Sequence, residues 1–519
     1  MRSITDAAGL AEILRPRTDL LLERDVGDGR FEAATGPVRS YCRTVEVVPP
    51  TPLEGPLGPE GTVPGQDVAV TQTVDFRLAV PYFGWLFVLP FKHALRRPGG
   101  DRAPWWAPPA RLDARAASVL GTLALLTVAS GYLNTLFTQT IPFAGDEFGA
   151  SNSAQGVAGS VVRVGGLVAL LVMVQADRRG RKAVLLAAST AGSLLALTGA
   201  LAPSLPWLTG SQMLARAFAT TILLLVTIVA AEEMPAGSRA YAVSLLAMAS
   251  GLGAGVCVIG LRLADIGARG WRLLYVVPLL ALPIVSAVRR NLPESRRFAA
   301  PHVPGAMAGH GGRLALLAAS GVLANLFVAP SSQFGNQYLR TERGFSGGRI
   351  GLLSVTIGTP AVIGIVAGGR IADVRGRRLV AAFALVFGTL CTIGYFFSSG
   401  WQMWVVATFG TVISAAAIPA LGVYGPELFP TGLRGRANGL VAVSSLLGSA
   451  SGLILCGVLS DSFGRIGPAM SILAAGPLLL AVLVLAAYPE TAGKELEDLN
   501  PEDRPPPGAT LNGPLGPRP

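Results

Sequence analysis

Residues 177–182 read DRRGRK, and residues 373–378, 196 positions later, read DVRGRR. Both stretches are polar and basic, and each lies between long apolar runs. Two further pairs follow in the same order at nearly the same offset: EEMPAGSR and ELFPTGLR (232–239 and 427–434), then PES and PET (293–295 and 489–491). Three matches at one offset indicate two related halves of about 190 residues each.

The composition is typical of a membrane protein. Of the 519 residues, 51% are apolar and only 14% are charged, and the mean hydropathy is +0.52. A soluble protein of this length needs more charge to cover its surface. Apolar runs of about 20 residues, long enough to cross ~30 Å of hydrocarbon, predict twelve transmembrane helices: 116–140, 154–175, 183–202, 207–231, 240–262, 272–288, 314–334, 350–371, 379–398, 402–424, 438–460 and 468–487.

The basic residues predict the orientation of these helices. Arg and Lys gather in the loops after the second, sixth, eighth and tenth spans, whereas the first, third and ninth loops contain none. Positive loops face the cytoplasm, so we expect a multi-pass protein of the cell (cytoplasmic) membrane with both termini cytoplasmic. The net charge of +11 follows from these clusters, and the expected partner is the lipid bilayer and no nucleic acid.

Residues 1–110 differ from the rest of the chain. Positions 41–47 and 68–76 alternate between apolar and polar residues, which predicts two half-buried strands on either side of a Pro/Gly-rich loop. The apolar segment 78–91 is too short to span a bilayer. It is interpreted either as an interfacial segment on an anionic leaflet or as the core edge of a small folded domain. The Pro/Gly-rich tail from residue 501 is expected to be disordered.

Neither a metal nor a cofactor is expected. The four cysteines and three histidines show no disulfide or metal-ligand spacing. The sequence also lacks a nucleophile elbow, a Walker loop and a dinucleotide fingerprint. We therefore predict that the chain is not an enzyme. Repeated halves in so apolar a chain are instead typical of secondary transporters.

The repeated motifs resemble those of the major facilitator superfamily. The loop after the second span of that family reads G-x-x-x-D-R-x-G-R-[RK]. The first copy here has Met173 in place of the leading Gly, and the second has Val374 in place of the Arg. The two E-x6-R segments resemble an element of sugar porters and metabolite symporters. The segment 489–494 (PETAGK) resembles the P-E-T-x-G-K ending of the same group.

This resemblance implies one charge network per half at the cytoplasmic helix ends. A carboxylate there pairs with arginines and with a neighbouring helix N-terminus, and such a latch must open in each transport cycle. A topology signal combined with a tight Gly turn is the alternative interpretation. The predicted latch residues are Asp177, Arg178, Gly180, Arg181, Asp373, Gly376, Arg377, Glu232, Arg239, Glu427, Arg434, Glu294 and Glu490.

Charged residues within the spans are the candidate binding residues, because a charge at this depth usually faces a cavity or a partner. Arg163 and Arg216 lie at similar depths, whereas positions 359 and 411 of the second half are both Thr. Arginine suits bidentate binding of a carboxylate, so the pair predicts an anionic organic substrate; snorkelling toward the interface is the alternative. Amides on the seventh span line a cavity or bond between helices. The predicted substrate-binding residues are Arg216, Arg163, Asn325, Gln333, Asn336 and Tyr424.

We therefore expect an all-α membrane protein of twelve helices in two pseudo-symmetric six-helix halves, with a small N-terminal cytosolic region that contains some β-strand. The expected domains are the N-terminal cytosolic or interfacial region, the first half, the central cytoplasmic loop, the second half and the cytoplasmic tail: 1–110, 116–288, 289–313, 314–487 and 488–519.

The expected function is secondary active transport of a small polar organic solute, with an organic anion or metabolite as the candidate, by alternating access of a monomer. Coupling to protons is implied by the resemblance, although the first span lacks the Asp of metabolite symporters at 131–134. Two alternatives stay open. One is a sugar porter, although the sugar-binding residues of that group are largely missing. The other is a non-transporting membrane sensor with a ligand-binding N-terminal domain.

Overall fold

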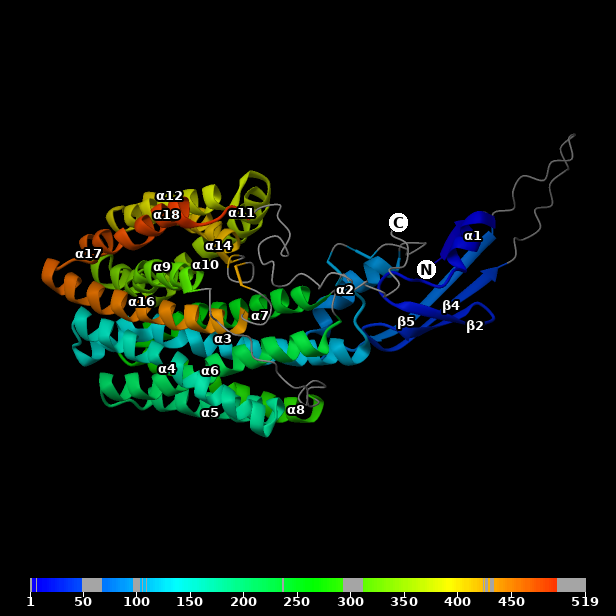
Figure 1. Cartoon of the computed structure of the whole chain (residues 1–519). Coiled ribbons are helices and arrows are strands. Elements are labelled where there is room, and N and C mark those ends of the chain that lie inside the picture. Colours follow the sequence, from blue (N-terminus) through cyan, green and yellow to red (C-terminus); the bar gives the residue numbers. More distant parts are fainter. Residues whose placement is uncertain are drawn as a thin grey trace, which may run out of the picture.

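A computed structural model shows a helical bundle with a small β-sheet region beside one end (Figure 1). We call the end of the bundle that faces the sheet the sheet end, and the opposite end, where α17 (Ile466–Leu473) lies, the far end. The structure describes residues 2–5, 7–48, 68–96, 103–104, 106–108, 110–235, 238–292, 311–422, 424, 428–429 and 434–491. The predicted loop between the two long strands and the predicted disordered tail lie outside these residues.

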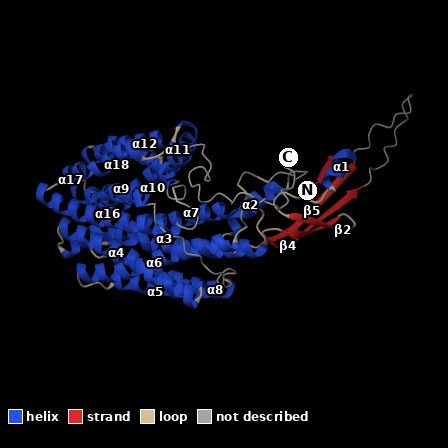
Figure 2. Ribbon diagram, in the orientation of Figure 1, coloured by secondary structure: helices blue, strands red, loops and turns tan. Residues whose placement is uncertain are grey.

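The N-terminal region is a five-stranded antiparallel sheet in the order β1-β5-β4-β3-β2, drawn in red in Figure 2. The two predicted alternating segments form its longest ladder, which pairs Val38 with Leu78 at one end and Val48 with Ala69 at the other. This confirms the predicted β-structure. The elements are β1 (Arg2–Thr5), α1 (Ala7–Ile13), β2 (Leu22–Gly27), β3 (Arg30–Thr35), β4 (Val38–Val48) and β5 (Val68–Leu78).

A buried ion pair between Arg43 and Glu23 ties this region together. Arg43 also donates to the carbonyl oxygen of Ile13 at 2.7 Å, and the Tyr41 hydroxyl donates to Glu23 Oε1 at 2.6 Å. Burial, followed by the bond to Glu23, raises the pKa of Tyr41, so its hydroxyl stays a donor. Because every partner is satisfied, the network fixes the end of α1 against the sheet.

Helix α2 (Gly84–Leu95) connects the sheet to the bundle. Its last turn is held by Arg17, which donates to the carbonyl oxygens of Ala94 and Leu95, both at 3.1 Å. Phe91 is buried against the sheet, whereas Trp85 and Leu89 near its start are 71% and 76% exposed. The segment 78–91 thus contains a buried part and an exposed apolar part.

The described residues contain twelve helical segments long and apolar enough to cross a membrane, as predicted. The first six pack as one half of the bundle, and the sixth is built from short 3-10 turns followed by one helix. These elements are α3 (Ala114–Phe148), α4 (Asn152–Arg179), α5 (Arg181–Ala200), α6 (Leu205–Glu233), α7 (Arg239–Gly260), η2 (Leu261–Ile266), η3 (Gly270–Tyr275), η4 (Val277–Leu280) and α8 (Ala281–Asn291).

The second six spans repeat this arrangement with more interruptions. Pro360 separates two helices of the eighth span, since proline removes a backbone donor and crowds the preceding turn. The seventh span ends in a π-helical turn. The elements are α9 (Gly311–Gln337), η5 (Tyr338–Glu342), α10 (Gly347–Gly358), α11 (Ala361–Arg375), α12 (Arg377–Phe397), α13 (Gly400–Ala415), α14 (Ala417–Gly422), α16 (Arg434–Phe463), α17 and α18 (Ala475–Ala487).

Candidate functional site

The two intramembrane arginines lie together in the first half. Helices α4 and α6 approach so closely that a Cβ on Gly165 would stand 2.2 Å from the carbonyl oxygen of Met213. This contact places the two arginines on neighbouring, closely packed helices, within three residues of the contact on each side. Arg216 donates to the backbone oxygen of Asn134 on α3 at 3.0 Å. A guanidinium held by one carbonyl, with a second positive charge on the next helix, is poorly compensated at this depth.

Neither arginine has a carboxylate partner among the residues that the structure describes. Asn134 is itself held in place, since its amide donates to the carbonyl oxygen of Ser130 at 3.1 Å and its side-chain oxygen faces Thr220 at 3.4 Å. The two arginines and the amide are therefore a positively charged, hydrogen-bonding group within the first half.

A cavity of about 700 Å³ occupies the second half. Helices α9, α10, α12 and α13 supply most of its wall, which is largely apolar. Its polar side chains are two amides and a set of hydroxyls: Gln139, Asn336, Ser331, Ser332, Ser354, Thr389, Thr392, Tyr395, Thr411 and Ser414. Gln139 comes from α3 of the first half and stands five residues after Asn134, which is about 7.5 Å along a helix. The cavity thus touches α3 of the first half, whereas Arg163 and Arg216 are not among the residues that line it.

The three predicted amides on α9 have three different roles. Asn336 lines the cavity and donates to Gln139 Oε1 at 2.6 Å, which joins the two halves. Gln333 is buried and donates to the backbone oxygen of Gln155 on α4 at 3.0 Å. Asn325 accepts from Ser449 on α16 at 3.3 Å, within the second half. Of the three, only Asn336 is among the cavity-lining residues.

Contacts between the halves close the bundle at its far end. Beyond the amides on α9, Arg340 of η5 pairs with Asp146 of α3 at 2.5 Å and stacks over the ring of Phe143 at 4.1 Å. Ser160 on α4 donates to the backbone oxygen of Ala450 on α16 at 2.8 Å. A Cβ on Gly156 would stand 2.3 Å from the carbonyl oxygen of Leu453, so α4 and α16 touch along their backbones.

Two aspartates cap helices of the opposite half at this end. Asp265 in η2 accepts from the backbone N–H groups of Gly347 and Gly348, at 2.6 and 2.7 Å, where α10 begins. Asp461 in α16 accepts from the backbone N–H groups of Asn152 and Ser153, at 3.0 and 2.8 Å, where α4 begins. A carboxylate is stabilised there by the unpaired N–H groups and the helix dipole.

These two caps are a fourth duplicated element that the sequence analysis missed. Asp461 follows Asp265 by 196 residues, the offset of the other motifs. The local sequences LAD and LSD (263–265 and 459–461) are short and carry no basic residues, so a search for charged loops passes over them. The offset alone is the signal that finds them. We call Asp265 and Asp461 the reciprocal caps.

At the sheet end, the described latch residues join helices of the same half. Arg181 at the start of α5 pairs with Glu232 at the end of α6. Glu490 accepts from the backbone N–H groups of Arg377 and Arg378 at 3.0 and 3.4 Å, and therefore caps α12. The Arg377 side chain donates to Thr491 at 2.9 Å.

The turn before each of these helices has the same backbone shape. Gly180 has φ +92° and ψ 145°, and Gly376 has φ +101° and ψ 136°. A residue with a side chain rarely adopts such angles. The side chains of Asp177, Arg178, Asp373, Arg239 and Arg434, and the whole of Glu294 and Glu427, lie outside the described residues.

Tyr424 lies at the sheet end and not in the cavity wall. It is fully buried, with its ring 4.7 Å from that of Tyr488 between the ring centres. Burial, followed by the charge of Glu490, raises the pKa of Tyr424 to about 12. Its surroundings are therefore those of the latch rather than of the arginines.

Comparison with known families gives a match over both halves of the chain. The sequence profile described as Major Facilitator Superfamily matches residues 123–309 and 315–516. The chain belongs to this superfamily. It is therefore a multi-pass membrane protein of a transporter family, whose members carry out secondary active transport and are not enzymes. A comparison with curated proteins gives no match.

Solved structures of the same fold include three transporters. The inward-open xylose transporter XylE from E. coli has a TM-score of 0.63 at 17% identity, over 75% of this chain and 99% of that chain. The nucleoside transporter NupG has a TM-score of 0.62 at 12% identity, over 72% of this chain and 100% of that chain. A bacterial homologue of the human lysosomal transporter Spinster, in an inward-facing conformation, has a TM-score of 0.57 at 17% identity, over 72% of this chain and 94% of that chain. At these identities the likeness shows the fold alone.

Proposed function

We propose that this superfamily member moves a small organic anion across the cytoplasmic membrane by alternating access. The observation that carries the proposal is the pair Arg163 and Arg216, which lie on the closely packed helices α4 and α6 without a carboxylate partner among the described residues. Two like charges at membrane depth repel and are poorly solvated. An anion between them removes both penalties, and the guanidinium fork suits a carboxylate or phosphate.

The rest of the solute occupies the cavity of the second half. Its wall offers hydroxyls and amides on an apolar surface, which fits a metabolite with a carbon skeleton and a few polar groups. The xylose and nucleoside transporters of this fold carry uncharged polar solutes. A sugar is therefore the second candidate, although it gives the two arginines no counter-charge.

Orientation and state follow from the loop charges. We propose that the sheet end and both termini face the cytoplasm, because the basic loops gather there. The closed far end is then the outer side, and the described state is inward-facing. The residues predicted as the latch from the sequence close the cytoplasmic end in the opposite state. The domain boundaries 1–110, 116–288, 289–313, 314–487 and 488–519 are part of the same proposal.

A cysteine pair tests the orientation. Gly267 lies exposed at the far end, where an added Cβ would have no heavy atom within 4 Å, and Val374 at the sheet end is 79% exposed. In a background without the four native cysteines, an impermeant thiol reagent added to intact cells should label Gly267→Cys and not Val374→Cys. Labelling of Val374→Cys alone would reverse the assignment.

An uptake screen tests the function. Purified protein is reconstituted in proteoliposomes and offered monocarboxylates, dicarboxylates, organic phosphates and neutral sugars, each with and without a pH gradient. We expect uptake of at least one anion, greater with an inward proton gradient, and none of the neutral sugars. Uptake of a sugar alone would favour the sugar porter. Binding of a ligand by the N-terminal region with no flux of any solute would favour the sensor.

A further inference from the structure

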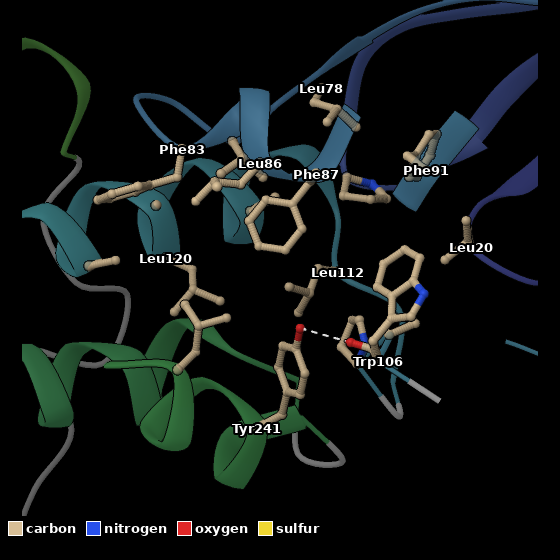
Figure 3. A pocket seen from close by; sticks show the side chains of 18 of the residues that line it. Leu20, Leu78, Phe83, Leu86, Phe87, Phe91, Trp106, Leu112, Leu120 and Tyr241 are labelled. Atoms are coloured by element: carbon tan, nitrogen blue, oxygen red, sulfur yellow. Dashed lines mark hydrogen bonds between the residues drawn. The ribbon is translucent and has the colours of Figure 1, made fainter. Parts of the chain in front are cut away.

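An apolar cavity lies between the N-terminal region and the bundle, away from the transport pathway (Figure 3). Its volume is about 140 Å³, and its wall is almost entirely hydrocarbon. Four parts of the chain supply the wall. They are the sheet region with Leu20 and Leu78, the α2 segment with Phe83 and Phe87, the α3 segment with Leu112 and Leu120, and α7 with Leu245 and Ala249.

The cavity is built and held by polar contacts around it. The Tyr241 hydroxyl donates to the backbone oxygen of Trp106 at 3.1 Å, the bond drawn in Figure 3. Ser238 accepts from the N–H of Ala110 at 2.8 Å and donates to its carbonyl oxygen at 2.7 Å. These bonds fix the segment before α3 to the start of α7. The cavity is therefore a preformed space and not a gap between loosely placed parts.

Its mouth opens beside an exposed apolar stripe. Leu86 on α2 and Met248 and Leu252 on α7 line the cavity and are 47%, 62% and 55% exposed. On α7 the same exposed stripe continues through Val256 and Ile259, within a membrane span. On α2, Trp85 and Leu89 are exposed and are followed along one helical stripe by Lys92 and Arg96. An exposed helix stripe with apolar residues at one end and basic residues at the other is typical of a helix in the headgroup region.

We propose that the cavity binds the end of one acyl chain of a membrane phospholipid. An enclosed apolar cavity of about 150 Å³ stays dry and accepts a benzene-sized group, so this one accepts a few methylene groups while the rest of the chain stays in the bilayer. The lipid thereby joins the N-terminal region to α3 and α7 of the first half.

A photoreactive lipid tests the proposal. The full chain is placed in nanodiscs that contain a phospholipid with a diazirine near the end of one acyl chain, and the cross-linked residues are mapped by mass spectrometry. Leu112 is only 6% exposed, so bulk lipid does not reach it. We expect cross-links at Leu112 and Leu120 in the wild-type protein. Their absence would overturn the proposal.

Filling the cavity provides the matched comparison. Ala249 lines the cavity and is 5% exposed, whereas Val256 on the same helix is 51% exposed to lipid. Ala249→Phe should lower cross-linking at Leu112 by about tenfold because an apolar space filled by protein accepts no ligand, and Val256→Phe should leave it unchanged. If Ala249→Phe does not fold, Ala117→Leu fills the same space from α3. Cross-linking that persists in a folded, filled variant would contradict the assignment.

Whether the bound acyl chain belongs to a phospholipid or to a free fatty acid is tested separately. Excess free fatty acid is added to the same nanodiscs before illumination. Unchanged cross-linking at Leu112 supports a phospholipid chain, whose headgroup and second chain anchor it in the bilayer. Displacement by the fatty acid would show that the site takes a free amphiphile, and would overturn the phospholipid assignment.

Discussion

The two halves of the bundle agree at their ends and differ in the middle. Gly180 and Gly376 have the same rare backbone angles, and Asp265 and Asp461 each cap a helix of the other half. At mid-membrane the correspondence stops, because the positions of Arg163 and Arg216 are occupied by Thr359 and Thr411 in the second half.

This difference separates two functions of a transporter whose halves rock against each other: the opening and closing of the two ends, and the recognition of the solute. Opening and closing is shared equally by two halves that move against one fixed site, so the residues that hold the ends are kept in both copies. Recognition of a solute with one charged end requires no symmetry. In the proposed site, the first half supplies the charge and the second half supplies the cavity. Each prediction below tests one side of this division.

The largest effect is expected at Arg216. Arg216→Lys keeps the charge but loses the planar fork, and hydrogen bonds to charged groups are worth roughly 1.5–3 kcal/mol. The proposed anion should then be transported roughly 10- to 100-fold less efficiently, as measured by uptake in proteoliposomes against concentration. Transport at the wild-type rate by both Arg216→Lys and Arg216→Gln would remove Arg216 from the site.

The next effect is expected on stability at the repeated glycines. Ala at Gly376 must adopt φ +101°, and its Cβ would stand 2.9 Å from Glu490, so Gly376→Ala should cost about 1–3 kcal/mol. Gly180→Ala should cost a similar amount if the copies are equivalent. Gly358→Ala is the control, since nothing lies within 4 Å of its added Cβ. Thermal melting in detergent gives the comparison, and equal melting temperatures for all three would contradict it.

A smaller effect is expected at the reciprocal caps. Asp461→Asn and Asp265→Asn keep the shape but remove a charge at a helix N-terminus, worth about 0.3–1 kcal/mol. Each substitution should therefore raise the ratio of molecules with an open far end to molecules with a closed far end by roughly two- to fivefold. Distances between spin labels at the far ends of α4 and α16 measure this population. A shift for one aspartate and none for the other would break the symmetry of the ends.

Sequence patterns predicted the regular parts of the fold for a physical reason. A membrane helix needs about 20 apolar residues, and that requirement is visible without any partner. The breaks within spans, such as the 3-10 turns η2 to η4, leave hydropathy unchanged and were not predicted. Strands β2 and β3 were missed because β2 carries charged residues, among them Glu23, which is buried by its pair with Arg43.

The candidate site was predicted unevenly. Charge within an apolar run identified Arg163 and Arg216, because such a charge stands out against its neighbours. The amides on α9 share one helical face in the sequence, yet Gln333, Asn336 and Asn325 bond to α4, α3 and α16 respectively. Which neighbouring helix contacts a given side chain depends on how the helices pack, and the sequence of one helix does not predict that packing.

The smallest effect is expected at Thr411, the counterpart of Arg216. Thr411 lines the cavity, but its hydroxyl already donates to the carbonyl oxygen of Ala407 at 2.8 Å. It can therefore accept a bond from the solute but offers little to an anion. Thr411→Val keeps the shape and removes the hydroxyl. Because this hydroxyl already bonds within its own helix, the loss is expected at the lower end of the range for a neutral hydrogen bond, about 0.5 kcal/mol. We expect transport to fall by no more than roughly threefold, with the preference for anions unchanged. Loss of transport as severe as in Arg216→Lys would place recognition on both halves, and the division between symmetric ends and an asymmetric middle would fail.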